Sequence, residues 1–262
     1  MTTAAKRIKT SAEENSLEIA VRPCAGLAEF ATCIEIERAV WGSADVDIVP
    51  LPLFVVAAET GGQVLGAFAG ERMIGFTLAI AGIRGRKPFL HSHMTAVLQQ
   101  FRNRGAGRGL KLLQRQEALG RGIDVVEWTF DPLEIKNAYF NFRLGAVARR
   151  FIPNMYGTTT SPLHGGLPTD RLVAEWWLRS LRVSRALADK RSARRSRKKE
   201  VARIKIPVDF ARIRGTNPEE AARLQAEVRL EFEHWLSRGY AATGIEVSEE
   251  KAEYLLEPWT ER

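Results

Sequence analysis

A strand, a glycine-rich turn and a helix follow one another in the stretch Val97-Leu98-Gln99-Gln100-Phe101-Arg102-Asn103-Arg104-Gly105-Ala106-Gly107-Arg108-Gly109-Leu110. The start of a helix presents backbone N–H groups that the helix itself cannot bond, together with the positive end of the helix dipole. Glycines let such a backbone approach an anion closely, and three arginines add positive charge. The stretch therefore predicts a binding site for a pyrophosphate or a similar anion.

Two other kinds of phosphate loop do not fit the spacing of this turn. A Walker A loop ends in Gly-Lys-Ser/Thr, which this turn lacks. A dinucleotide-binding turn has the pattern G-x-G-x-x-G and an acidic residue at the end of the next strand, a combination that is also missing. A turn that only reverses the chain, with its arginines in solvent, is the simpler alternative. The strand before the turn and the helix after it favour the anion site.

Strands and helices alternate on both sides of the turn. Strand-like patterns cover 18–22, 63–69, 73–80, 89–98, 124–130, 146–152 and 172–178, and helical spacing covers 25–40, 105–119 and 133–144. We predict an α+β (mixed α/β) domain over 18–181, in which a central mixed sheet is flanked by helices. The polar segment 1–17 is expected to be a disordered tail.

The end of the chain predicts a linker and a small accessory unit. Residues 182–203 contain ten Lys or Arg and two Asp or Glu, a net charge of +8, which equals the formal charge of the whole chain. The basicity therefore belongs to a linker, and a nucleic-acid partner is not expected. A strand over 205–210, a helix that Asn217 caps, and strands over 240–247 and 252–259 predict a β-α-β-β unit over 204–262.

The bulk composition is that of an ordinary soluble globular protein, with 45% hydrophobic and 27% charged residues. We expect no membrane association, because no apolar run reaches the roughly 18 residues that a membrane span needs. Cys24 and Cys33 form neither a CxxC pair nor part of a metal-binding quartet. The expectation is a cytoplasmic protein with reduced cysteines and no bound metal.

The turn also carries a family resemblance. Arg102-x-x-Gly105-x-Gly107 matches the R/Q-x-x-G-x-G/A signature of the GNAT (general-control-related N-acetyltransferase) superfamily, and the element order over 18–180 is similar to that of the family. The stretches Trp128-Thr129-Phe130-Asp131-Pro132 and Leu144-Gly145-Ala146-Val147 resemble a subgroup of predicted acetyltransferases with an added C-terminal region.

The resemblance implies that acetyl-CoA or another acyl-CoA binds as co-substrate. Backbone groups around Ala96, Val97 and Leu98 would hold the pantetheine arm, and one strand amide near Ala96 would polarise the thioester carbonyl. The pyrophosphate would lie on the turn, at Arg102, Asn103, Arg104, Gly105, Ala106, Gly107 and Arg108. The family's asparagine on the following helix falls on Glu134 here, so Asn137, three residues later, is the candidate for that cofactor contact.

Transfer of an acyl group to an amine requires that the ammonium lose a proton. His91 lies eleven residues before the opening Arg102 of the signature, where the resemblance implies a base, and histidine titrates in the right range. His93 shares its face of the strand, and Glu127 on the next strand is the rival base. Ordinary hydrogen-bonded strand residues are the alternative for both histidines, and a metal-binding H-x-H pair without an evident third ligand is the third option.

The family's usual proton donor to the departing thiolate is a tyrosine, and its position is occupied by Asn141. The acid role of Asn141 is therefore in doubt. The turn and the family resemblance favour an acyl-CoA-dependent N-acyltransferase that transfers an acetyl or similar group to an amino acid or another small amine. A catalytically degenerate acyl-CoA-binding or regulatory protein is the alternative.

Overall fold

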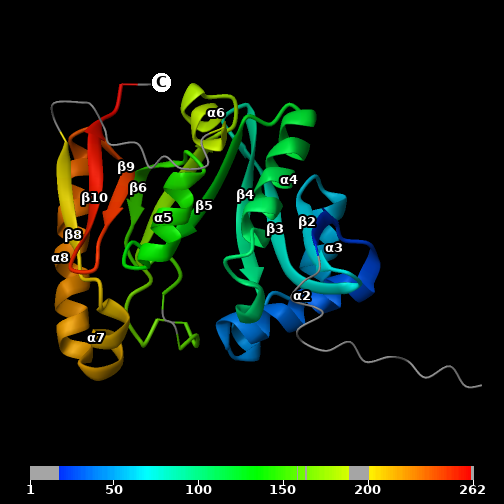
Figure 1. Ribbon diagram of the computed structural model, residues 1–262, viewed down its shortest axis with the longest axis horizontal. Helices are drawn as coiled ribbons and strands as arrows, with labels where there is room; N and C mark the ends of the chain where they lie inside the picture. The colour runs from blue at the N-terminus through cyan, green and yellow to red at the C-terminus, as the bar shows by residue number, and fades with distance from the viewer. Residues whose placement is uncertain (1–17, 158, 163, 189–200, 261–262) are drawn as a thin grey trace, which may run out of the picture. The chain divides into compact units, whose positions relative to one another are not determined.

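The computed structural model describes residues 18–157, 159–162, 164–188 and 201–260 (Figure 1). They divide into two compact units. The first unit holds the described residues of Met1–Gly42, Ile48–Ala81 and Ser92–Glu117, and the second holds those of Ser43–Asp47, Gly82–His91 and Ala118–Arg262. Strands β3 (Arg72–Arg84) and β4 (Lys87–Val97) contribute to both units. The predicted tail lies outside the described residues.

The first unit is a sheet with an apolar layer on each face. Its strand order is β1-β2-β3-β4, in which β1 (Ile19–Pro23) and β2 (Gln63–Ala69) run antiparallel. Every residue of β2 is buried, because both faces of the strand are covered. Helices α2 (Gly26–Trp41) and α3 (Leu51–Glu59) cover one face, and α4 (Ala106–Gly120) covers the other. The loop that follows β4 is thereby fixed between a strand and a buried helix.

The second unit continues the mixed sheet. Its strand order is β4, β5 (Val125–Phe130), β7 (Arg171–Trp177), β6 (Val147–Ile152), β9 (Tyr240–Val247), β10 (Ala252–Pro258) and β8 (Ala202–Ile206). β4 and β5 pair in parallel, and the other recorded pairs are antiparallel. The predicted fold class, an α+β fold with a central mixed sheet flanked by helices, is confirmed.

Helices pack on this sheet through aromatic side chains. Helix α8 (Pro218–Ser237) contacts β6, β8 and β9. Phe232 of α8 lies in edge contact with Tyr254 of β10, and Tyr254 in turn meets Phe142 of α5 (Ile135–Arg143). All three rings therefore belong to one face of the sheet. Trp128 of β5 bonds Asn141 of α5 and lies on that same face, so the preceding residue, Glu127, lies on the opposite face, because side chains alternate along β5.

The C-terminal residues are part of the second unit's sheet. β9 pairs with β6 at Ala148↔Ala242, and Tyr254 donates its hydroxyl to the carbonyl of Pro132, 2.7 Å away. The predicted β-α-β-β order is present, with a further helix α7 (Phe210–Thr216) that the sequence analysis missed. The division of the chain into an acyltransferase domain and an accessory unit stays a prediction.

The basic segment 182–203 is structured at both ends. Helix α6 (Leu181–Ala188) buries Val183, and β8 begins at Ala202. Residues 189–200 lie outside the described residues. In the described part of the chain no single helix is long and apolar enough to cross a membrane, while the bent pair Gly26–Trp41 and Asp45–Glu59 passes that test together, by length and composition.

Candidate functional site

The turn after β4 leads directly into the start of helix α4. A short 3₁₀ turn, Gln99–Phe101, follows the strand, and the ring of Phe101 is buried beneath the turn. The first hydrogen bond of α4 runs from the N–H of Gly109 to the carbonyl of Gly105, over 2.8 Å. The amides of the residues between them precede that bond, so the helix supplies them with no acceptor. This is the arrangement that an anion can bind.

The backbone of the turn explains its residue types. Asn103 and Gly105 have φ of 62° and 89°, in the left-handed region that asparagine tolerates and glycine favours. A Cβ on Gly105 would meet nothing within 4 Å, so the glycine is required by conformation and not by space. The sequence prediction of a tight glycine turn is met at this position.

The three arginines of the turn have different positions. Arg102 turns back and donates from Nε to the carbonyl of Val97, over 3.1 Å. The guanidinium of Arg104 lies 5.5 Å from the centre of the Phe101 ring. Arg108 is half-buried in the first turn of α4. Arg102 therefore braces the turn against the strand, and all three arginines bring positive charge to the helix start.

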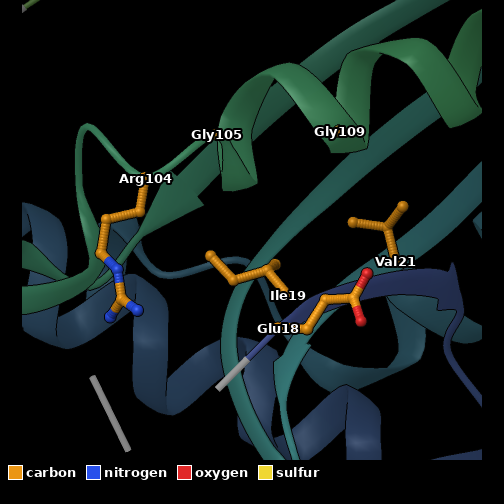
Figure 2. A pocket seen from close by; sticks show the side chains of 6 residues that line it. All are labelled: Glu18, Ile19, Val21, Arg104, Gly105 and Gly109. Carbon is orange, nitrogen blue, oxygen red and sulfur yellow. The ribbon is translucent and has the colours of Figure 1, made fainter. Parts of the chain in front are cut away.

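A hollow of about 330 Å³ lies beside this helix start, on the side of β1. It is lined by Glu18, Ile19, Val21, Arg104, Gly105 and Gly109 (Figure 2). The carboxylate of Glu18 would repel a phosphate in the hollow. The part of the hollow beside Glu18 is therefore unfavourable for a phosphate.

The backbone of β4 narrows the choice of groups for a pantetheine arm. The N–H of Leu98 donates to the carbonyl of Ile74 on β3, over 2.9 Å. The Ala96 carbonyl also faces β3, 2.6 Å from the place where a Cβ on Gly75 would stand. Backbone groups alternate in direction along a strand, so those of Val97 point away from β3. Among the three predicted residues, Val97 is the one whose backbone N–H fits such a contact, while its carbonyl accepts from Arg102.

A buried lysine near the turn was missed by the sequence analysis. Lys111 of α4 is 3% exposed, and its ammonium donates to Ser92 Oγ on β4 at 2.8 Å and to Gln114 Oε1 at 3.1 Å. Burial lowers the pKa of Lys111 to about 7. The position of Lys111 in the sequence of α4 does not indicate burial, because lysine is a normal residue for the exposed face of a helix. Lys111 ties α4 to β4, the two elements that hold the turn.

In the second unit the sheet brings the two candidate bases together. His91 of β4 pairs in register with Glu127 of β5. Register partners of a parallel pair project from the same face of the sheet, so both side chains lie on the face opposite α5 and α8. His91 is half-buried, and His93, two residues on, is exposed.

The contacts of Glu127 do not fit a general base. Arg84 donates to both of its oxygens, through Nη1 to Oε1 and through Nη2 to Oε2 at 2.9 Å, and Arg150 donates from Nη2 to Oε2 at 2.7 Å. Burial alone raises the pKa of Glu127, but the hydrogen bonds and charges of the two arginines outweigh it and hold the pKa below its usual range. Glu127 is thus a buried counter-ion, and His91 remains the candidate base.

Asn141 is buried where the sequence resemblance would need a proton donor. Its Oδ1 accepts from Trp128 Nε1 at 3.0 Å, and its amide nitrogen has no partner among the described residues. These contacts favour a structural role, in which Asn141 orients Trp128 against Trp176. Asn137, the predicted cofactor contact on α5, is exposed.

A tyrosine hydroxyl lies on the face of β5 that carries Glu127. Tyr156 is 42% exposed, and its hydroxyl is 3.0 Å from Thr129 Oγ1, two residues after Glu127 on β5. Its loop is fixed by Asp170, which accepts from the guanidinium of Arg229 at 2.7 and 2.9 Å.

His164, in the same loop, is not a base at neutral pH. Thr159 Oγ1 lies 2.5 Å from its Nδ1, and Arg171 Nη2 lies 2.8 Å from its Nε2. Burial, helped by the charges of Arg171 and Arg214, lowers the pKa of His164 to about 4. The described residues contain no group of three or more His, Cys, Asp or Glu side chains that could hold a metal.

Comparison with known proteins decides the fold. No family model matches the chain, and no curated protein matches it. A solved structure from Desulfovibrio desulfuricans, assigned to the GNAT family of acetyltransferases, matches with a TM-score of 0.51 at 12% identity over 62% of this chain and 99% of that one. This chain has the GNAT fold.

Other solved structures with the GNAT fold are similar at the same level. NAA60 from Arabidopsis thaliana in complex with acetyl-CoA has a TM-score of 0.49 at 14% identity, over 61% of this chain and 99% of its own. The ribosomal-protein-S18-alanine N-acetyltransferase of Escherichia coli has a TM-score of 0.47 at 15% identity, over 60% and 92%. The predicted GNAT fold over about three-fifths of the chain is confirmed, and the predicted subgroup with a C-terminal region stays a prediction.

Proposed function

We propose that this protein is an acyl-CoA-dependent N-acyltransferase, which transfers an acetyl or similar acyl group to an amine. The observation that carries the proposal is the glycine-rich helix start at Gly105–Arg108, with the arginines around it, in a chain with the GNAT fold. A diphosphate is the natural ligand of such a helix start. A cytoplasmic location belongs to the same proposal, since Cys24 and Cys33 are free thiols.

The proposed donor site lies along β4 and the turn that follows it. The backbone of Val97, which points away from β3, would bond the pantetheine arm or polarise the thioester carbonyl. The amides at the start of α4, with Arg104 and Arg108, would bind the pyrophosphate. The chemistry that the co-substrate supplies is a thioester, whose acyl carbon is open to attack by a neutral amine.

The proposed acceptor chemistry rests on His91. An imidazole can take the proton that an ammonium must lose, either directly or through a water molecule. The departing thiolate needs no strong acid, because the ordinary pKa of a thiol is near 8.5. A proton donor, where one contributes, is better sought at Tyr156 than at the buried Asn141.

The second candidate function is an acyl-CoA-binding protein without turnover. The observation that favours it is Asn141, which is bonded to Trp128 and offers no proton. Both candidates predict acyl-CoA binding at the turn, so binding alone does not separate them.

A screen of small amines against several acyl-CoAs tests the proposal. The free thiol of coenzyme A is measured with a chromogenic disulfide, and the acylated amine is confirmed by mass spectrometry. Thiol release that depends on an amine supports the transferase. Saturable acyl-CoA binding with no release for any amine would support the binding protein, and an absence of acyl-CoA binding would overturn both.

A further inference from the structure

Two arginines are fixed side by side on the face of the second unit that carries His91. Arg84 spans both oxygens of Glu127, and Arg150 bonds Oε2 of the same carboxylate at 2.7 Å. Arg150 also reaches Glu175, from Nε to Oε1 at 3.5 Å. The side chains of Glu127 and Glu175 are each 4% exposed, so the two carboxylates lie beneath the guanidinium groups.

The outer sides of both guanidinium groups remain open. The side chain of Arg84 is 56% exposed, and that of Arg150 is 42% exposed. A guanidinium has five N–H donors. Arg84 uses two of them in hydrogen bonds to Glu127, and Arg150 uses one in a hydrogen bond to Glu127 and turns a second toward Glu175 in the 3.5 Å ion pair. The donors that are left form two forks, held in place by buried carboxylates, which is the geometry that binds a carboxylate in a bidentate manner.

The charges of the cluster do not cancel. Arg149 joins it by bonding Glu175 from Nε at 3.0 Å and from Nη2 at 2.5 Å. Three guanidinium groups then stand over two carboxylates, which leaves one positive charge. A cluster that served only to pair Glu127 and Glu175 would need one arginine for each carboxylate. The excess charge matches a monoanion, such as a carboxylate, better than a phosphate dianion.

The cluster lies beside the candidate base. His91 is the register partner of Glu127, the residue that fixes both arginines. The guanidinium of Arg84 packs over the ring of Phe89 at 4.6 Å, and Phe89 projects from the same face of β4 as His91, two residues later. An amine that reached His91 would therefore have Arg84 and Arg150 within the length of a small molecule.

We propose that Arg84 and Arg150 bind a carboxylate of the acceptor, so that the acceptor is an amine bearing a monoanionic group, such as an α-amino acid. The inference rests on the proposed function, because it takes the face of His91 as the place where the acceptor binds. It narrows that function from amines in general to carboxylate-bearing amines.

Direct binding tests the inference without any need for turnover. The probes are N-acetyl amino acids and their matched N-acetyl amino acid amides, which differ in the carboxylate charge alone. Binding to the full chain is measured by saturation-transfer NMR and calorimetry, with and without coenzyme A. We expect the acids to bind at least about tenfold more tightly than the amides. Equal affinity of acids and amides, or binding of neither, would overturn the inference.

Variants locate the carboxylate contact. Arg84→Gln and Arg150→Gln should each remove most of the preference for the acid, and Arg84→Lys should keep part of it, since charge remains and the fork is lost. Arg223→Gln is the matched control, because Arg223 is also 56% exposed and paired with glutamates, on the outer face of α8. Circular dichroism checks folding. Loss of the preference in the control, or its survival in both Arg84→Gln and Arg150→Gln, counts against the site.

The outcome is separable from that of the proposed function. Thiol release is measured in parallel on amino acids and amino acid amides. Acids that bind through Arg84 and Arg150 without any acyl transfer would leave a carboxylate site at the two arginines, but they would reject the transferase and with it the acceptor role of that site. Acyl transfer with equal kcat/KM for acids and amides would support the transferase and overturn the carboxylate contact.

Discussion

Lys111 and Glu127 show how this protein accommodates a buried charge in two ways. Glu127 keeps its charge, because Arg84 and Arg150 supply hydrogen bonds and positive charge at both of its oxygens. The ammonium of Lys111 donates to Ser92 and Gln114, and burial lowers its pKa to about 7. Glu127 contributes an ion pair to stability. Lys111 contributes hydrogen bonds and makes the free energy of unfolding depend on pH.

The pH-dependent term at Lys111 can be measured. In the unfolded chain the pKa of lysine is near 10.4, so the unfolded state binds more protons than the folded state between about pH 7 and 10. The wild-type stability therefore rises with pH across that window. Lys111→Met lacks this group, so its stability should not gain from the rise in pH. Relative to the wild type, the free energy of unfolding of Lys111→Met should therefore be lower at pH 10 than at pH 7 by roughly 2–5 kcal/mol. Urea denaturation at each pH gives this difference, and a value independent of pH would show that the amine is not deprotonated on folding.

The base assignment makes a separate prediction at His91. Loss of a general base commonly lowers turnover by about 10²–10⁴-fold. His91→Ala should therefore lose at least about tenfold in kcat, with acyl-CoA affinity unchanged and partial rescue at high pH, where more of the amine is already neutral. Steady-state thiol release between pH 6 and pH 9 gives these values.

The controls for His91 lie on the same strand and on the next one. His93→Ala tests for damage to β4, and it should retain most of the activity. Glu127→Gln tests the rival base, and we expect its effect to appear in stability and acceptor KM, because Glu127 holds Arg84 and Arg150. Near-wild-type turnover of His91→Ala, together with a pH-dependent loss in Glu127→Gln, would transfer the base role to Glu127.

Some residues of the candidate site could be read from the sequence, and others could not. The turn residues were identified because glycine spacing and arginine content are local properties. The pairing of His91 with Glu127 needed only the two strands to be adjacent. The arginines on Glu127 come from β3 and β6, which are separated from it by 43 and 23 positions, and no local pattern encodes such contacts. Lys111 was missed because its burial depends on how α4 packs against β4.

At the scale of elements, the start of α4 can be blocked with one substitution. Gly107→Glu places a carboxylate where the pyrophosphate is proposed to bind. A glutamate near a helix N-terminus stabilises the helix, and glutamate has a better helix propensity than glycine, so the fold should be retained. We expect the affinity for acyl-CoA, measured by calorimetry, to fall at least about tenfold.

The same helix offers the control for this substitution. Gly120 ends α4, is exposed, and has nothing within 4 Å of the place where a Cβ would stand. Gly120→Glu should therefore leave acyl-CoA affinity within about twofold of the wild type. The added charge is exposed and far from the proposed site, and salt at physiological concentration screens it. Equal affinities of both variants and the wild type would place the cofactor elsewhere.

Element boundaries were predicted well where a strong periodic or capping signal exists. β2 was predicted at its observed bounds, and α8 begins beyond Asn217, whose Oδ1 accepts from the N–H of Glu220 at 3.2 Å. Helix α3 was missed because Leu51–Glu59 is apolar almost throughout and shows no helical period. Helix α3 is stabilised by packing against α2 and the sheet, and its sequence lacks the amphipathic pattern that would predict a helix.

At the scale of the whole molecule, the C-terminal strands and α8 complete the core of the second unit. Phe232 is fully buried and stacks on Phe151 of β6 at 5.9 Å, and its ring lies 5.0 Å from that of Tyr254. Phe232→Ala should lower the free energy of unfolding by about 3–5 kcal/mol. Leu230→Ala, on the same helix and 65% exposed, should change it by less than about 1 kcal/mol. Thermal and urea denaturation compare the two, and equal effects would mean that α8 does not pack as described.

The join between β6 and β9 also has a mechanical consequence. The recorded pairing across it is Ala148 with Ala242, whereas β9 and β10 pair along their whole length. A pulling force between β6 and the end of β10 would load that alanine pair and the stacked rings of Phe151 and Phe232 before it sheared the β9–β10 ladder. Under tension, the last strands and α8 would detach as one block once the bonds of Tyr254 to Pro132 and of Arg229 to Asp170 had also broken, and the protein would lengthen in two steps.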